Sequence, residues 1–391
     1  MYSINRYSYL HNYFSDLSPR LLNRCVDRAL GFVTDVHDLE PPFNRLCSEQ
    51  PNIPEQNLDL LHRPIGFGRW AMPKLRHDLS NKDEYVVICA LETIMELVID
   101  PEKAFEAIKL KIIERMVNLL MAENPVIRER TAMALWSLAK LTKAREMIAA
   151  NKELLRNISV CVEDQYEEVR LHIAKLLQTV SEFWKVADEL IEFGFISILL
   201  HILQDKEEKY IILIHLRTLQ SLMYSIQGKM FAIDNGGFDI LLEFLRDENT
   251  HIISEALSCI AQLTSTCVGE KLAREKNLMN ILNTLLHDER PEVHTNAASV
   301  IMFSTVKATG KLMAAEHPTM VPRLMALAQN RLNPSTQMFS IKALTNISEN
   351  PKIRKIMNQE YSHELALIQV GDDPDIKTWK DQLMGVIGWV P

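Results

Sequence analysis

Histidine pairs at short spacing can bind a metal ion, and His287 and His294 bracket the segment HDERPEVH. A zinc site needs three or four protein ligands, and no third ligand accompanies this pair, so we expect two solvated imidazoles in a loop between helices. The glycines of GFG (66–68) lack a following phosphate-loop pattern and predict a turn. G-x-S-x-G, Walker and H-E-x-x-H motifs are absent. We therefore expect no enzyme, and no metal, cofactor or small-molecule substrate.

Cysteine chemistry offers no site either. The six cysteines are scattered, and no two of them form a C-x-x-C pair. This usage predicts reduced thiols that fill small gaps in the core, and it argues against disulfides or zinc. The residues concerned are Cys25, Cys47, Cys89, Cys161, Cys259 and Cys267.

The elements that carry these residues repeat along the chain. EFGFISILLHILQD (192–205) is followed by DNGGFDILLEFLRD (234–247) and then by EKNLMNILNTLLHD (275–288). Apolar residues recur four, eight and eleven positions into the next helix, which places them on one helix face. A period of about 42 residues is typical of armadillo or HEAT repeats. The anchor residues that begin these helices are Val86, Ile127, Val169, Ile211, Ile252, Val293 and, more weakly, Thr336.

Short local signals mark the helix boundaries. An Asx residue can cap free N–H groups, and a following Pro is tolerated at the first helical position. The steps Gly194-Phe195 and Gly237-Phe238 predict a left-handed glycine between the first two helices of a unit, which favours armadillo over HEAT. The five predicted helix starts are Asp100-Pro101, Asn124-Pro125, Asn333-Pro334, Asn350-Pro351 and Asp373-Pro374.

Composition agrees with an all-α protein, since the chain has only 12 Gly in 391 residues and is 47% hydrophobic. We predict a right-handed α-solenoid of about seven armadillo- or HEAT-like repeats, with a concave side that can hold a partner. Residues 63–360 would form the solenoid. Residues 1–62 would form an N-terminal extension with one amphipathic helix (18–30) and a Pro-rich linker, and residues 361–391 a C-terminal capping helix.

Charge and hydropathy narrow the range of partners. A net charge of -8 argues against a protein that neutralises nucleic-acid phosphates. The longest apolar runs, such as FISILLHIL (195–203), fall far short of the ~20 residues that span a bilayer. No secretory signal pattern opens the sequence. We expect a cytoplasmic protein that binds neither nucleic acid nor membrane.

A partner peptide could lie in the concave groove. Armadillo proteins that grip extended peptides carry a ladder of asparagines just before a core residue of the third helix, and here only one position of that column is Asn. A generic peptide ladder is therefore disfavoured, and the isolated Trp136 is better explained by packing. The column, ten positions after each anchor, reads Glu96, Ser137, Thr179, Ser221, Gln262, Phe303 and Asn346.

The N-terminal extension holds four of the nine tyrosines in its first thirteen residues. They could belong to a frayed terminus that caps the first repeat. Alternatively they could form an arm that docks on a neighbouring protein, because Tyr buries a large area at low entropic cost. These residues are Tyr2, Tyr7, Tyr9 and Tyr13.

Three segments, in order along the chain, carry a resemblance: GFGRWAMPKLRHDL (66–79), DPEKAFEAIKLKIIERMVNLL (100–120) and NAASVIMFSTVKATGKLMAAE (296–316). Together they resemble the family of the radial spoke head protein 14 homologue, armadillo-repeat components of ciliary radial spokes, over roughly residues 64–391. Arg69 and Trp70 in the first segment complete the candidate interaction surface. Residues 1–62 have no counterpart in the family.

The resemblance implies a protein without enzymatic activity that is a structural part of the radial spokes in the axoneme of motile cilia and flagella. Its partners would be other radial spoke proteins in a large axonemal complex, where it would belong to the cytoskeleton. A soluble adaptor that binds a partner peptide or helix in its concave groove is the alternative. The residues alone support a helical-repeat protein that binds or scaffolds other proteins.

Overall fold

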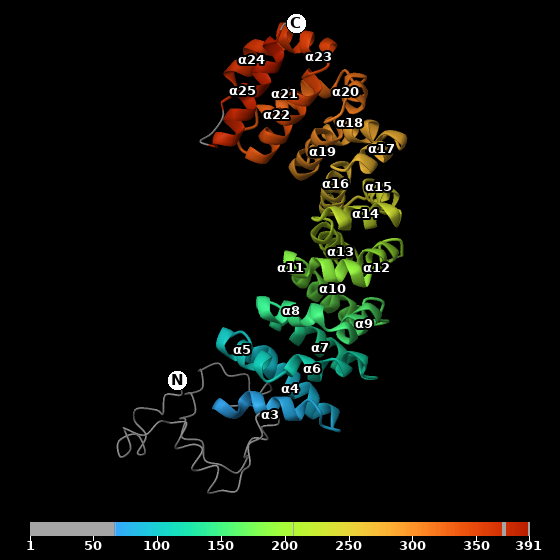
Figure 1. The fold of residues 1–391 in the computed structure, drawn as a ribbon, viewed down its shortest axis with the longest axis vertical. Helices are drawn as coiled ribbons and strands as arrows, with labels where there is room; N and C mark the ends of the chain where they lie inside the picture. Colours follow the sequence, from blue (N-terminus) through green and yellow to red (C-terminus); the bar gives the residue numbers. More distant parts are fainter. Residues whose placement is uncertain (1–65, 67, 206, 370–372, 390–391) are drawn as a thin grey trace, which may run out of the picture. The chain divides into compact units, whose positions relative to one another are not determined.

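The computed structural model describes residues 66, 68–205, 207–369 and 373–389, and every regular element in these ranges is a helix (Figure 1). This confirms the all-α prediction. The chain divides into two compact units between Phe183 and Trp184. Each unit is described by itself.

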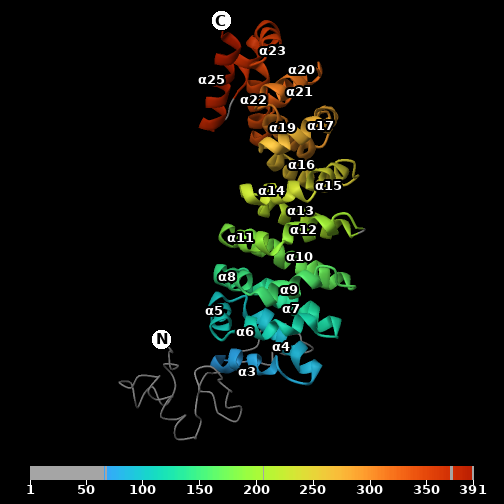
Figure 2. The ribbon, with the colours of Figure 1, turned by 45° about the vertical axis from the view of Figure 1, so that its right-hand side comes forward.

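The described part of the first unit begins with a short 3-10 helix and then alternates short helices with long ones. The long helices are α4, α7 and α10, which pack in that order, α4 on α7 and α7 on α10 (Figure 2). The elements are η1 (Gly68–Trp70), α3 (Ala71–Asp78), α4 (Glu84–Leu97), α5 (Pro101–Lys109), α6 (Ile112–Met116), η2 (Asn118–Met121), α7 (Pro125–Leu138), α8 (Thr142–Ala150), α9 (Lys152–Cys161) and α10 (Glu167–Ser181).

The second unit continues the same alternation of two short helices and one long helix. Its first elements are α11 (Trp184–Phe193), α12 (Phe195–Ile202), α13 (Lys209–Leu222), α14 (Ile226–Asp234), α15 (Gly237–Phe244), α16 (Thr250–Thr264), α17 (Cys267–Glu275), α18 (Leu278–Leu286) and α19 (Pro291–Ser304). The remaining elements are α20 (Ala308–Ala315), α21 (Met320–Ala328), α22 (Pro334–Ser348), α23 (Pro351–Ile356), the π-helical turn η3 (Met357–Tyr361), α24 (Ser362–Leu367) and α25 (Pro374–Gly388).

The long helices of the second unit contact one another in sequence order, from α13 through α16, α19 and α22 to α25. Each long helix buries a stripe of side chains against its neighbours because no single repeat can cover its own apolar face. The anchors Ile211, Ile252 and Val293 are completely buried, and so is Thr336. Three helices per repeat is the armadillo arrangement, so the α-solenoid prediction holds within each unit.

All five predicted Asx-Pro helix starts are confirmed. In each case the Asx side chain accepts a hydrogen bond from a backbone N–H of the first turn, and Pro occupies the first helical position. At Asn124, for example, Oδ1 accepts from the Val126 N–H at 2.9 Å. The sequence therefore located these boundaries through capping alone.

One glycine prediction needs correction. Gly194 has the expected left-handed backbone, with φ of 100°, immediately before α12. In the next repeat the left-handed residue is Gly236, with φ of 74°, and Gly237 is already the first residue of α15. Two adjacent glycines left the sequence ambiguous by one position, and the helix begins at the second of them.

Three glycines of the second unit lie where helices approach one another closely, which the sequence did not predict. Gly228, Gly269 and Gly310 each stand third in the first short helix of a repeat. A Cβ atom at these positions would lie 2.1, 2.0 and 1.8 Å from a carbonyl oxygen near the end of the preceding long helix. Real Cβ atoms cannot approach so closely, so the backbones touch at each of these three junctions.

Among the described residues, no single helix has the length and apolar composition that crossing a membrane requires, although α16 and α17 pass that test as a pair bent by 119°.

Candidate protein-interaction surface

The long helices keep one face in contact with solvent. Positions three, six, ten and thirteen after each anchor lie along one side of the helix, and every residue at these positions is half-buried or exposed except Ser299. We call this face the exposed strip. The ten-position column predicted from sequence belongs to the exposed strip. Its first residue, Glu96, is exposed. The other residues of the column are half-buried: Ser137, Thr179, Ser221, Gln262, Phe303 and Asn346.

Several polar side chains of the exposed strip are already bonded to the next long helix. In the second unit, the Arg217 guanidinium on α13 donates to the Glu255 carboxylate on α16 at 2.8 Å. Asn296 on α19 donates through Nδ2 to the backbone oxygen and the Oγ of Ser254, at 3.1 and 2.7 Å. These bonds tie adjacent repeats together and reduce the number of groups that are free to bind a partner.

Asn346, the one residue that fits the asparagine pattern, is also engaged. Its Nδ2 donates to the backbone oxygen of Met302 at 2.9 Å, which joins α22 to α19. The Met302 carbonyl gains a partner in this way, and one of the two amide hydrogens of Asn346 is used inside the protein. Phe303, beside this bond, is half-buried.

In the first unit the exposed strip gathers positive charge around Trp136. Its indole N–H donates to Thr179 Oγ1 on α10 at 3.0 Å, and the Thr179 hydroxyl donates to the Lys175 backbone oxygen at 2.9 Å. The ammonium groups of Lys140 and Lys175 lie 5.3 and 5.4 Å from the centroid of the indole ring. We call this group, with Ser137, the Trp136 platform.

Arg130 and His172, two further basic residues of the exposed strip in the first unit, add little positive charge to the platform. Arg130 on α7 pairs with Glu92 on α4 at 3.1 Å and with Glu129 at 3.3 Å. Burial, which is the largest effect, and the nearby Lys175 both lower the pKa of His172 on the same strip, so this imidazole stays neutral near pH 7. The positive charge of the platform therefore comes from its two lysines.

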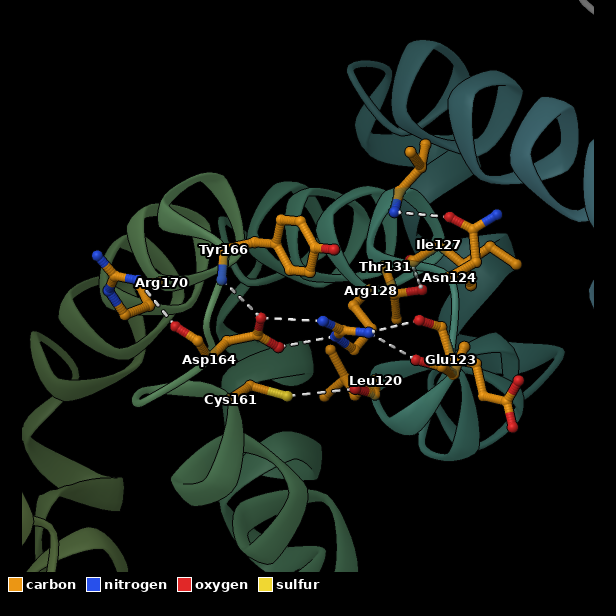
Figure 3. A network of polar contacts seen from close by, with 12 residues as sticks. Leu120, Glu123, Asn124, Ile127, Arg128, Thr131, Cys161, Asp164, Tyr166 and Arg170 are labelled. Carbon is orange, nitrogen blue, oxygen red and sulfur yellow. Dashed lines mark hydrogen bonds and ion pairs between the residues drawn. The ribbon is translucent and has the colours of Figure 1, made fainter.

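A second polar network holds the loops between repeats in the first unit (Figure 3). The Arg128 guanidinium on α7 makes a bidentate pair with Asp164, with Nε–Oδ2 of 2.7 Å and Nη2–Oδ1 of 2.9 Å. It also donates to the backbone oxygens of Ala122 and Glu123 at 2.8 and 2.9 Å. Asp164 in turn accepts from the Tyr166 N–H at 3.0 Å. Only 11% of the Arg128 side chain and 9% of the Asp164 side chain are exposed, so the network is structural.

The sequence carries a signal for this network in the position of two arginines relative to the anchor residues. Arg128 and Arg170 both follow their anchor by one position, and each donates to a backbone oxygen six residues earlier, Ala122 and Asp164, at 2.8 Å. His294 occupies the same position in its repeat, and its Nδ1 lies 3.1 Å from the backbone oxygen of Asp288. A hydrogen-bonding side chain at this register position thus fastens the loop that precedes the long helix.

The placement of His294 corrects the expectation of two solvated imidazoles. His294 is 6% exposed, whereas His287 is exposed. The two imidazoles therefore lie in different environments, one buried and one in contact with solvent. Within the described ranges no group of three or more His, Cys, Asp or Glu side chains could hold a metal ion.

Two of the predicted core cysteines lie in the core and one does not. Cys161 and Cys259 are buried, and their thiols donate to the backbone oxygens of Leu120 and Leu216 in the preceding repeat. Burial raises the pKa of Cys161 to about 11 and also raises that of Cys259. Cys267 is exposed and Cys89 half-buried; Cys25 and Cys47 lie outside the described residues.

The remaining predicted surface residues are at the N-terminal side of the first unit. Arg69 and Trp70 form part of η1, and Trp70 is half-buried. Tyr2, Tyr7, Tyr9 and Tyr13 lie outside the described residues. Within each unit the ten-position residues lie on the same face of consecutive long helices, and in the first unit Lys140, Lys175 and Trp136 lie beside them.

Known proteins resemble this chain at the level of its fold. An engineered protein of known crystal structure matches with a TM-score of 0.73 and 17% identity over 81% of this chain and 78% of its own. A designed armadillo repeat protein matches at 0.54 and 18%, over 60% of this chain and 99% of its own. Another, solved in complex with the peptide (KR)4, matches at 0.55 and 18%, over 60% and 99%.

One family model matches part of the second unit. It describes the non-SMC mitotic condensation complex subunit 1, and the match spans residues 236–363. This is less than half of the chain. The comparisons thus support the architecture seen in both units, and the fold of this chain is an armadillo-type α-solenoid.

Proposed function

We propose that this chain is a non-enzymatic scaffold of the radial spoke in the ciliary or flagellar axoneme, where it holds other spoke proteins and supports motility. The support for the spoke is the resemblance of three ordered segments. They correspond in the structure to η1 and α3, to the elements α5 through η2, and to α19 with α20. The support for scaffolding is the armadillo-type fold.

The observation that carries the scaffold proposal is the number of large apolar side chains left exposed. In the second unit, Tyr224 is 82% exposed, Ile226 is 76% exposed and Trp184 is 70% exposed. All three lie at the start of α11 or at the junction of α13 with α14. Large apolar side chains left this exposed are typical of protein-binding surfaces, and they fit a component of a permanent assembly better than a free monomer.

Cross-linking of the native protein in isolated cilia, followed by identification of the linked peptides, tests the proposal. A spoke scaffold should be cross-linked to spoke proteins through several surfaces, and it should remain with the axoneme when salt is raised. The triple variant W184S/Y224S/I226S should be extracted at lower salt than the wild type. A protein found on mitotic chromosomes and absent from cilia would overturn the spoke assignment, and the partial match to a condensation-complex subunit makes this outcome worth measuring.

A soluble adaptor that takes a partner peptide along the exposed strip is the second candidate. It is favoured by the similarity to a designed armadillo repeat protein in complex with the peptide (KR)4. It is disfavoured by the hydrogen bonds that already occupy Asn346 and Asn296. An adaptor would form a cytosolic pool that exchanges its partner, so fluorescence recovery of the tagged protein within seconds would favour it over the scaffold.

A further inference from the structure

Two positive charges converge on one aromatic ring in the first unit, and neither lysine makes an ion pair within the described part of the chain. Lys140 follows α7, and Lys175 lies on α10, so their approach is a product of repeat packing. Neither ammonium group has a carboxylate within ion-pair distance among the described residues. A cation–π contact at an exposed site contributes only about 0.5–1 kcal/mol, and the neutral ring does not cancel the repulsion between the two ammonium groups.

The ring itself is fixed in place, as a binding site requires. The bond from the Trp136 indole N–H to Thr179 holds the side chain between α7 and α10, and the Thr179 hydroxyl is anchored in turn to its own helix. Trp136 and Lys175 are half-buried, which limits their rotamers, and Ser137 beside them has no hydrogen-bond partner among the described residues. At Trp136 and Lys175, less conformational entropy would therefore be lost on ligand binding than at fully exposed side chains.

Other cations of the exposed strip are paired with acids or contact an aromatic ring singly. Arg130 holds Glu92 and Glu129, and Arg217 holds Glu255. Lys342, six positions after its anchor as Lys175 is, lies 4.8 Å from the Trp379 ring with no second cation beside that ring. The Trp136 platform is the place in the described chain where two unpaired lysines from consecutive repeats meet on one ring.

We propose that the Trp136 platform binds an acidic segment of a partner protein in an extended conformation, with one carboxylate at Lys140 and another at Lys175. Side chains on the same side of an extended chain repeat every second residue, about 7 Å apart. The two ammonium groups lie 5.3 and 5.4 Å from the same ring centroid, which allows that separation. The recognised pattern is thus two acidic residues separated by one other residue. The Ser137 hydroxyl donates to the backbone of the segment.

Fluorescence anisotropy with the full-length protein tests this inference. The probe is a fluorescein-labelled dodecapeptide of alternating Glu and Ser, and the comparison peptides replace Glu by Gln or by Lys. The acidic peptide should bind, and its affinity should fall as salt rises because exposed charges are screened. K140E/K175E should weaken binding about tenfold or more, since each pair changes from attraction to repulsion.

The variant K342E is the matched control, because it reverses a lysine of the same strip that also contacts a tryptophan. It should leave the affinity of the acidic peptide within about twofold, and circular dichroism should show that all variants remain helical. The inference is overturned if the acidic peptide fails to bind wild type, if K140E/K175E binds it as well as wild type, or if K342E weakens it equally. Equal binding of single-stranded oligodeoxythymidine at the same site also overturns it, because the platform would then select any polyanion.

The inference deepens the proposed protein-binding function, and the two can fail separately. An acidic peptide that ignores K140E/K175E removes the inference and leaves the spoke assignment intact. Absence of the native protein from ciliary cross-links removes the spoke assignment and leaves the peptide result unaffected. If both hold, K140E/K175E should lose the cross-links made through α7 and α10 and keep those made through the second unit.

Discussion

A buried histidine should make the stability of the second unit depend on pH. His215 on α13 is completely buried, and neither of its ring nitrogens has a hydrogen-bond partner in the described structure. Burial lowers its pKa from 6.5 to about 4, and the nearby Glu207 acts in the opposite direction with a smaller effect. The folded protein therefore holds this imidazole neutral under conditions in which the unfolded chain protonates it.

The direction and size of the effect follow from linkage. Between pH 4 and 6.5 the unfolded state binds more protons than the folded state, so the stability contributed by neutral His215 is complete above pH 6.5 and is lost as pH falls towards 4. A lowering of the pKa by about 2.5 units corresponds to about 3 kcal/mol at the acid limit, and to about 2 kcal/mol between pH 7.5 and pH 5. The variant H215L removes this pH-dependent contribution to the free energy of unfolding.

Urea unfolding of wild type and H215L at several pH values between about 5 and 7.5 measures the difference. H215L should be more stable at every pH, because two unpaired polar atoms leave the core at a gain of about 1–3 kcal/mol, and its advantage should grow by about 2 kcal/mol towards pH 5. H287L, which removes an exposed imidazole, controls for the loss of one histidine. Parallel pH profiles for wild type and H215L would refute the reasoning.

Three further predictions test the packing of the repeats. A298D places a carboxylate at a completely buried site of α19 and should lower the free energy of unfolding by about 3–5 kcal/mol. A308D, on the exposed start of α20, is the control and should not lower it. An unchanged melting temperature for A298D would contradict the proposed register. Removal of either partner of the Arg128–Asp164 pair should cost about 2–4 kcal/mol, and a double-mutant cycle in urea should give a coupling above about 1 kcal/mol, so additive effects would disprove the network. N346A should lose about 1 kcal/mol of stability without weakening the acidic peptide, and a lost peptide affinity would return Asn346 to the binding surface.

The sequence predicted the parts of this fold that depend on local rules. Asx-Pro pairs fixed five helix starts because capping requires only neighbouring residues, and the anchors located the buried faces because a helix repeats its side chains at a known angle. Gly236 escaped prediction because either glycine of a pair can take a left-handed backbone. His294 escaped because its burial depends on how a loop folds over the next helix.

The surface could be predicted only in outline. The column from Glu96 to Asn346 follows from periodicity and does lie on the exposed strip. Whether a side chain there is free depends on bonds to a residue about 40 positions away, such as Trp136 to Thr179 or Asn346 to Met302. Each of these bonds joins two repeats, so the sequence pattern of a single repeat does not predict it. The convergence of Lys140 and Lys175 on one ring has the same origin.

The glycines at the third position of α14, α17 and α20 make the backbone packing of the second unit independent of its solvent-facing side chains. Main chain rests on main chain at these junctions, so the angle between consecutive helices is set without reference to any side chain on the outside. Substitutions on the solvent-facing side can then accumulate, and new partners can be acquired or old ones lost, while the spacing of the repeats stays the same. The same property makes the second unit a frame on which an engineered binding surface could be placed, provided that Gly228, Gly269 and Gly310 are left in place.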